Sequence, residues 1–188
     1  MRLFFGFELP DSIREIADSA ISYLQSYIPT SVNWVESDAL HITFQFVGEV
    51  KPTEFSAVEE AFLASINECT EQIFTLRHVT CYPLRNPKVI WISLDNENKT
   101  LRKSVKNFQN RLKQLGYNVN KKDYQAHITL GRIKGDLMNL QMEHIIKAEV
   151  KQEEFSVDEI TLFESNLTKK GAIYRALQTY NLKELKET

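Results

Sequence analysis

Two short stretches of the chain share one tripeptide: His41-Ile42-Thr43-Phe44 and His127-Ile128-Thr129-Leu130. Each lies in a run rich in β-branched and aromatic residues, which is typical of a β-strand. Because residues i and i+2 of a strand point to the same face, each copy places an imidazole beside a hydroxyl and turns its apolar residues toward a core. Two such pairs that face each other across a cleft would supply an acid, a base and two hydroxyl donors.

The spacing of the two copies predicts the architecture. The histidines lie 86 residues apart in a chain of 188, close to half its length, which suggests two similar lobes. Hydrophobic periodicity and turn residues predict strands near residues 3–9, 32–35, 41–48, 72–82, 89–94, 126–133, 150–163 and 173–180, and helices near 11–28, 53–66, 101–115 and 137–147. We expect Asp11 and Thr53 to cap the first two helices and Gly116 to end the third. This order predicts an α+β fold with two pseudo-symmetric lobes, mostly antiparallel sheets, flanking helices and an active-site cleft between the lobes.

Composition limits the class of protein. With 188 residues, 43% of them hydrophobic, the chain can form one globular domain spanning residues 1–188. The net charge of −2 argues against a protein that follows long duplexes by neutralising phosphates. The basic residues on the predicted helix 101–115 are most simply a solvated face, with a role in nucleic-acid binding as the alternative.

No feature points to secretion, a membrane or a bound metal. The chain has neither a secretion signal nor an apolar run of about 18 residues. Cys69 and Cys81 have no metal-like spacing and are expected to be packing residues, so a reducing cytoplasm is the expected compartment. The other two histidines, His78 and His144, lack a threonine two positions on, and we interpret both as structural.

The paired histidines suit hydrolysis of a phosphoester. One imidazole can accept the proton of an attacking water while the other donates a proton to the leaving oxygen. Threonine hydroxyls can hold the non-bridging oxygens as negative charge shifts onto them. The sequence contains no zinc-binding helix motif, no phosphate-binding glycine loop and no nucleophile-elbow motif.

With these motifs the chain resembles the two-histidine (2H) phosphoesterase superfamily and, within it, the LigT-like (ThpR) RNA 2′,3′-cyclic phosphodiesterases. Further stretches carry the resemblance over nearly the whole chain. They are Arg2-Leu3-Phe4, Leu9-Pro10, Phe46, Gly48, Glu49, Val89-Ile90-Trp91, Gly131-Arg132 and the C-terminal Leu162, Ser165, Leu167, Gly171 and Tyr174. One departure is Phe44, where many relatives have leucine; it should point to the core.

The resemblance implies hydrolysis of a terminal ribose 2′,3′-cyclic phosphate to a 2′-phosphomonoester, with no cofactor and no metal. It implies that His41 is the proton donor, that His127 is the proton acceptor and that Thr43 and Thr129 hold the phosphate. Arg132 matches an arginine near the nucleotide base, where a planar guanidinium can stack. The expected partners are RNA ends or nucleoside 2′,3′-cyclic phosphates, and we expect a monomer.

Two alternatives remain open from the sequence. The same four side chains could recognise a terminal phosphate without turning it over, which would make the protein an RNA-end binding module. The second alternative is the ligation that the family can also carry out, in which tRNA halves are joined by a 2′,5′ linkage. Hydrolysis in ~55 M water should dominate over ligation unless the attacking hydroxyl is held in place.

Overall fold

The protein has the predicted α+β architecture. The structure is a computed structural model that describes residues 1–28, 32–119, 123–137, 139–168 and 171–183. Its elements, in chain order, are β1 (Arg2–Glu8), α1 (Asp11–Tyr27), β2 (Val32–Trp34), η1 (Ser37–Ala39), β3 (His41–Glu49), η2 (Pro52–Glu54), α2 (Phe55–Ile66), β4 (Gln72–Tyr82), β5 (Val89–Asp95), α3 (Lys99–Gln114), β6 (His127–Ile133), α4 (Asn139–Lys147), β7 (Glu154–Val157), β8 (Glu159–Thr168) and β9 (Gly171–Asn181).

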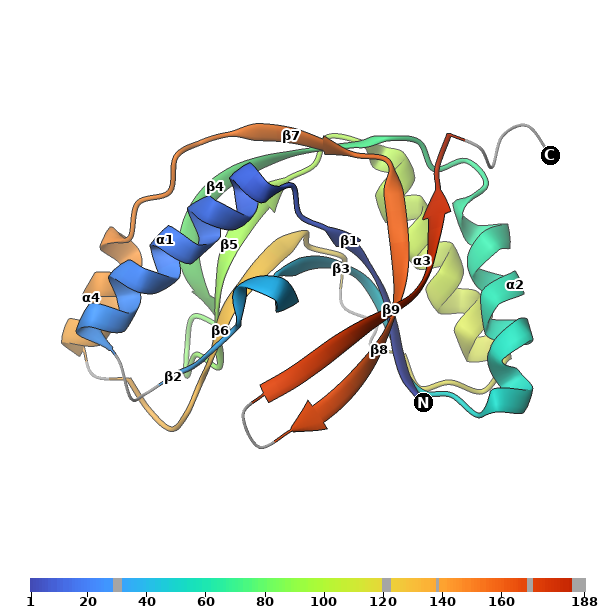
Figure 1. Ribbon diagram of the computed structural model, residues 1–188, viewed down its shortest axis with the longest axis horizontal. Helices are drawn as coiled ribbons and strands as arrows, with labels where there is room; N and C mark the ends of the chain where they lie inside the picture. Colours follow the sequence, from blue (N-terminus) through green and yellow to red (C-terminus); the bar gives the residue numbers. More distant parts are fainter. Residues whose placement is uncertain (29–31, 120–122, 138, 169–170, 184–188) are drawn as a thin grey trace.

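The strands form one curled antiparallel sheet that contains both lobes. Its order is β7-β4-β5-β6-β3-β1-β8-β9, and β2 pairs with the last residues of β6. The strands β6 and β3, which carry the two His-x-Thr copies, are therefore the middle pair, with three further strands on either side of them (Figure 1). The predicted lobes are the two halves of this sheet, which meet where β3 pairs with β6.

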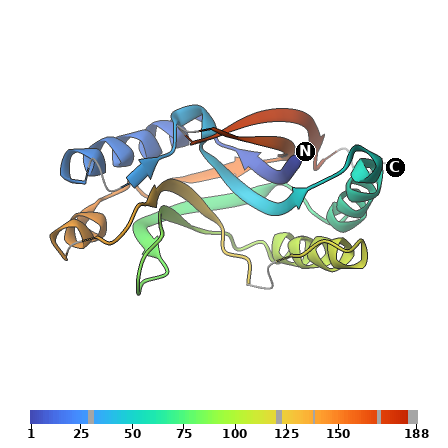
Figure 2. The same ribbon diagram turned by 90° about the horizontal axis from the view of Figure 1, so that it is seen from below.

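The four helices occupy the two ends of the sheet. α1 and α4 lie at one end and α2 and α3 at the other (Figures 1 and 2). Their apolar faces pack on one face of the sheet: the ring of Phe62 stacks on Phe5 with centroids 3.8 Å apart, and Phe108 meets Phe5 edge-on at 5.3 Å. Within the described ranges, none of the helices combines the length and apolar character needed to cross a bilayer.

The first strand separates the core from the cleft. Leu3, Phe5 and Phe7 belong to the main hydrophobic core, as alternation along a strand requires. Phe4 is equally buried but points to the opposite face, where its ring lies 4.9 Å from that of His41. Alternation along a strand separates Phe4 from Phe5 and Phe7 without saying which side faces the cleft, and the tertiary structure places Phe4 there.

The helix termini correct two predictions. Pro10, not Asp11, is the N-cap of α1: its carbonyl accepts hydrogen bonds from the backbone N–H groups of Ile13 and Arg14, which places Asp11 inside the first turn. Thr53 is not a cap either, because it lies inside η2, which leads directly into α2. Gly116 follows α3 with a positive φ of 89°, as predicted.

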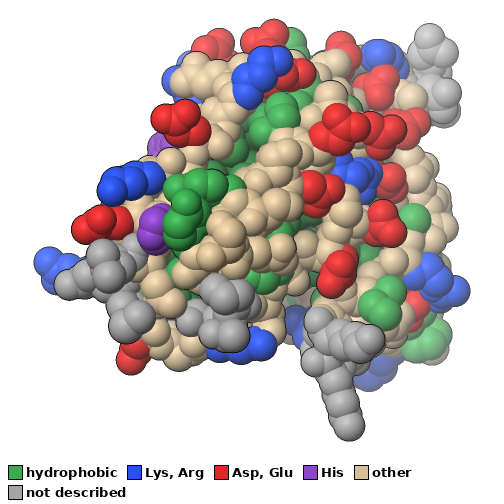
Figure 3. All heavy atoms as spheres, turned by 60° about the vertical axis from the view of Figure 1, so that its left-hand side comes forward, with side chains coloured by type: hydrophobic (Ala, Val, Ile, Leu, Met, Phe, Trp, Pro, Cys, Tyr) green, Lys and Arg blue, Asp and Glu red, His purple; other side chains and the backbone are tan. Residues whose placement is uncertain are grey.

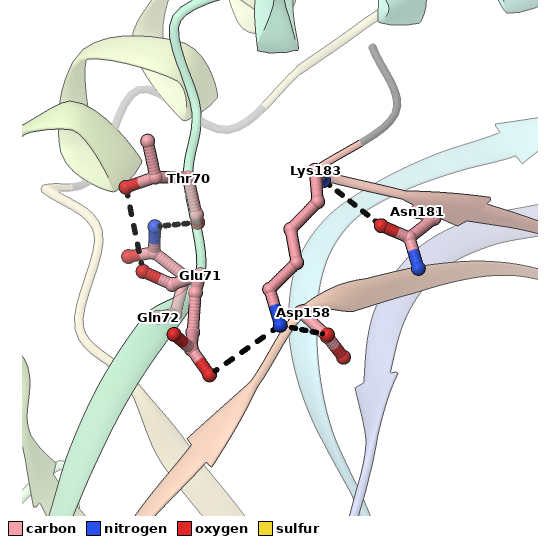
Figure 4. A network of polar contacts seen from close by, with 6 residues as sticks. All are labelled: Thr70, Glu71, Gln72, Asp158, Asn181 and Lys183. Carbon is pink, nitrogen blue, oxygen red and sulfur yellow. Dashed lines mark hydrogen bonds and ion pairs between the residues drawn. The ribbon is translucent and has the colours of Figure 1, made fainter. Parts of the chain in front are cut away.

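The predicted strand 150–163 is two strands, because the chain changes lobe within it. β7 pairs with β4 in one half of the sheet, whereas β8 pairs with β1 and β9 in the other. Asp158 lies at the junction, where its carboxylate accepts a hydrogen bond from Lys183 Nζ at 2.7 Å, and Glu71 lies 4.0 Å from the same amine (Figure 4). These contacts join the end of β9 to the start of β4. The sequence also predicts a turn near residues 166–171, between the last two predicted strands; residues 169–170 of this turn lie outside the described residues.

Candidate active site

The two His-x-Thr copies meet at the centre of the sheet. The pairing of β3 with β6 places Ile42 directly opposite Ile128, and both isoleucines are fully buried in the core. In an antiparallel pair, the residues on either side of this contact face each other crosswise, so His41 lies opposite Thr129 and Thr43 opposite His127. All four side chains line one cavity of about 300 Å³ on the other face of the sheet.

Backbone carbonyls orient both imidazoles in the same way. Nδ1–H of His41 donates to the carbonyl of Ala39, and Nδ1–H of His127 donates to the carbonyl of Gln125, each over 2.8 Å. A carbonyl can only accept, so the proton of each neutral ring is on Nδ1 and Nε2 remains free as a base. Nε2 of His41 lies 3.1 Å from Thr43 Oγ1, which can donate to it in the absence of substrate.

Burial makes both histidines weak bases in the free protein. Desolvation lowers the pKa of His41 from 6.5 to about 4; the hydrogen bond to Ala39 opposes this shift, and the positive charges of His127 and Arg132 add to it. Desolvation also lowers the pKa of His127, against the hydrogen bond to Gln125, and Arg132 contributes in the same direction as burial. Both rings are therefore neutral near pH 7. A bound phosphate anion would favour their protonated forms.

Three aromatic rings that pack on one another lie against His41. Its ring centroid lies 4.9 Å from that of Phe4, 5.0 Å from Tyr174 in an edge-to-face arrangement and 6.3 Å from Phe163. These residues come from β1, β9 and β8, so strands from distant parts of the sequence build one apolar wall. This wall is the physical cause of the low pKa of His41.

His127 has a smaller aromatic neighbourhood. The ring of Trp91 lies 4.2 Å from it, and Tyr82 stacks on Trp91 at 5.0 Å. Trp91 pairs with Thr129 across β5 and β6, which brings its indole to the same face as His127. In the sequence, Trp91 served only as part of the family resemblance. It lies between two isoleucines that face the core, and alternation along the strand therefore signalled that Trp91 points to the opposite face, where the cleft is.

Arg132 stands at one end of the cavity. It is exposed, lines the cavity and lies opposite Val89 of β5 and Asn33 of β2. The preceding residue, Gly131, is in close contact with β2: a Cβ atom there would lie 2.4 Å from Val32 Cγ1. Glycine at this position lets β2 pack against β6 and so sets the position of Arg132.

The remaining candidates lie away from this cavity. His78 is exposed and makes its contacts with Ser93, and His144 stacks on Tyr27 with centroids 3.8 Å apart. Both cysteines are free and buried, as expected for packing residues. Across the residues that the structure describes, no three His, Cys, Asp or Glu side chains are grouped so as to hold a metal ion.

Comparison with known proteins identifies the family. The model of the 2′-5′ RNA ligase superfamily matches residues 9–169. An RNA 2′,3′-cyclic phosphodiesterase of Archaeoglobus fulgidus is 32% identical over 185 residues, covering 96% of this chain and 99% of that protein. A protein of the same name from Methanocaldococcus jannaschii is 28% identical, covering 96% of this chain and 100% of the relative.

Solved structures share the fold at lower identity. TT0787 of Thermus thermophilus superposes with a TM-score of 0.79 at 21% identity, covering 97% of this chain and 98% of that one. The apo form of E. coli LigT gives a TM-score of 0.68 at 22% identity and covers 96% of both chains. The family model covers most of the sequence, and the first relative is similar over its full length. The chain therefore belongs to the 2′-5′ RNA ligase superfamily of two-histidine phosphoesterases.

Proposed function

We propose that this protein hydrolyses a terminal ribose 2′,3′-cyclic phosphate of RNA to a 2′-phosphomonoester. The observation that carries the proposal is the crosswise placement of two His-x-Thr pairs on one cavity, with Nε2 of each histidine unbound by backbone. The names of the relatives from Archaeoglobus and Methanocaldococcus support the same reaction.

The two histidines divide the proton transfers. His127 Nε2 takes a proton from water as the water oxygen attacks phosphorus, and His41 Nε2–H gives a proton to the 3′ oxygen as the P–O3′ bond breaks. His41 must be protonated for this step, and the negative charge of the bound phosphodiester offsets the cost that its aromatic surroundings impose. Thr43 and Thr129 donate to the non-bridging oxygens, and Arg132 contacts the base. These roles need no metal ion.

A single chain supplies the complete cavity. Its lining residues come from both halves of the one sheet, and no second copy is needed to complete the His-x-Thr pairs. We therefore propose that residues 1–188 act as one catalytic domain and as a monomer.

The test is product analysis with matched variants. An RNA oligonucleotide ending in a 2′,3′-cyclic phosphate is incubated with the protein in EDTA, and the terminal isomer is identified. We expect a 2′-phosphate with the wild-type protein, a rate lower by several orders of magnitude in His41→Ala and His127→Ala, and an unchanged rate in the control His78→Ala. Tight binding without product would favour the RNA-end binding module, and loss of activity in EDTA would contradict the metal-free mechanism.

The family's name favours ligation as a second candidate activity. In ligation, a 5′-terminal hydroxyl would replace water as the nucleophile: His127 Nε2 takes its proton as the 5′ oxygen attacks phosphorus, the P–O3′ bond breaks as the 3′ oxygen takes a proton from His41, and a 2′,5′ linkage forms. Incubation with paired tRNA halves tests this candidate, and the absence of joined product would count against it.

A further inference from the structure

The cavity has two distinct ends. Arg132 and Val89 lie at one end, and Gln109 and Tyr124 lie at the other, with the histidines between them. The second end is held by two contacts with β3: Gln109 Nε2 donates to Gln45 Oε1 at 2.8 Å, and the Tyr124 hydroxyl donates to the carbonyl of Thr43 at 3.2 Å. If the terminal base contacts Arg132, the rest of the RNA strand can leave the cavity at the opposite end, beside Gln109.

A second groove begins at this end of the cavity. It has a volume of about 390 Å³, runs along one flank of α3 and is lined there by Arg102, Lys106 and Lys113. It shares Gln109, Asp123 and Tyr124 with the catalytic cavity, so the two hollows adjoin each other. Figure 2 shows α3 beside the chain that leads into β6.

The charge of α3 differs from that of the rest of the protein. The helix carries six basic side chains and no acidic one, in a chain whose net charge is −2. By contrast, the face turned forward in Figure 3 shows acidic side chains spread among scattered basic ones. Within the described residues, no carboxylate lies within 4.0 Å of the amines of Lys106 and Lys113. Asp123 also lines the groove, where it offsets part of the positive charge.

An exposed aromatic ring lies at the same end. Phe46 lines the catalytic cavity and is 41% exposed, an unusual state for a phenylalanine. Its ring packs on Phe4 at 5.1 Å, which supports it from the protein side. A supported aromatic ring in the cavity and a groove lined by cations next to it are the combination that binds single-stranded nucleic acid without sequence preference.

We propose that the RNA strand upstream of the cyclic end leaves the cavity past Gln109 and lies along this flank of α3. Lys106, Lys113 and Arg102 bind its phosphates, and Phe46 stacks on the base that precedes the terminal nucleotide. From Arg102 to Lys113 the helix rises about 16 Å, enough to follow several nucleotides. The proposal rests on the proposed function and deepens it: the preferred substrate is an oligonucleotide end rather than a free nucleoside cyclic phosphate.

The test compares two substrates at two salt concentrations. kcat/KM is measured for a hexanucleotide with a 2′,3′-cyclic end and for a nucleoside 2′,3′-cyclic phosphate, with wild-type protein and with Lys106→Gln/Lys113→Gln. Each phosphate contact on a single strand contributes about −0.7 to the slope of log affinity against log salt, so two contacts give about −1.4. Between 50 and 200 mM salt, kcat/KM for the hexanucleotide should therefore fall about sevenfold more with the wild-type protein than with the variant. For the nucleoside substrate, kcat/KM of the wild-type protein and of the variant should be the same at each salt concentration.

A matched control lies on the same helix. Lys103→Gln/Arg111→Gln removes the same charge from the other flank of α3, where Lys103 pairs with Glu68, and should leave the salt slope for the hexanucleotide as in the wild type. Equal slopes for both double variants would overturn the proposal, as would an equal loss on both substrates. Phe46→Ala provides an independent readout: the KM for the hexanucleotide should rise at least fivefold more than the KM for the nucleoside substrate.

The two proposals fail in different ways. If neither substrate is turned over by the wild-type protein, the proposed function is wrong. If both substrates are hydrolysed and the α3 variants match the wild type on the hexanucleotide, the proposed function stands and the RNA path along α3 is wrong.

Discussion

The buried His41 should make folding stability depend on pH in a defined window. Its pKa is about 4 in the folded protein, because the rings of Phe4, Phe163 and Tyr174 exclude water, whereas an exposed histidine titrates near 6.5. Between these values the unfolded chain binds a proton that the folded protein does not. The free energy of unfolding therefore falls as pH falls from about 6.5 to about 4. The contribution of the neutral, buried His41 to this free energy is fully present above pH 6.5.

The size of the effect follows from the pKa difference. A difference of about 2.5 pKa units corresponds to about 3 kcal/mol, since each unit is worth 1.36 kcal/mol. That is a large part of the total stability of a typical domain. His127 adds to the loss in the same direction, because burial also lowers its pKa.

The assay is urea unfolding at several pH values between 4 and 7.5. The variant His41→Gln lacks the titrating group. As pH is lowered from 7.5 to 4, its free energy of unfolding should therefore fall by about 3 kcal/mol less than that of the wild-type protein. The exposed His78 provides the control, and His78→Gln should follow the wild-type curve. Carboxylates that titrate in the same range are common to all three proteins and cancel in the comparison. Parallel curves for wild type and His41→Gln would refute the reasoning.

Three further predictions concern the phosphate site and the packing around it. Thr43→Val and Thr129→Val should each lower kcat/KM by about 10² to 10³, because each removes one donor to the phosphate oxygens, and steady-state kinetics on a cyclic-phosphate end would show it. Gly131→Ala should cost about 1–3 kcal/mol in urea unfolding, because its new Cβ would lie 2.4 Å from Val32 Cγ1; an unchanged midpoint would contradict this packing. Phe62→Ala should lower stability by about 3–5 kcal/mol, because its fully buried ring stacks in the core, whereas kcat measured at low temperature on the folded fraction should stay close to wild type.

Local patterns were sufficient for most of the secondary structure and for choosing the two His-x-Thr pairs as candidates. Alternation predicted that His41 and Thr43 share a face while Ile42 points to the core, and the fully buried Ile42 confirms the second part. Hydrophobic periodicity and turn residues likewise predicted the helix α1 and the strands β4 and β5. Such features depend on residues within a few positions of one another, so a sequence displays them directly.

The errors have two causes. The N-cap of α1 makes its contacts through a backbone carbonyl rather than a side chain, whereas the division of residues 150–163 into β7 and β8 depends on which distant strands the backbone pairs with. Pro10 carries no side-chain oxygen and was passed over in favour of Asp11, although its carbonyl makes the capping contacts. Asp158 lies in a run that reads as one strand, and only the pairing of its flanks with different partners reveals the break.

By itself, the sequence determined the His-x-Thr pairs, the class of fold and the family to which the chain belongs. Tertiary structure alone decided that Ile42 faces Ile128, which brings the pairs together crosswise, and that Phe4 rather than Phe5 encloses His41. It also decided that a groove along one flank of α3 adjoins the catalytic cavity. The physical reason is that strand alternation assigns a residue to one of two faces, whereas strand register and sheet curvature determine which distant residues share that face.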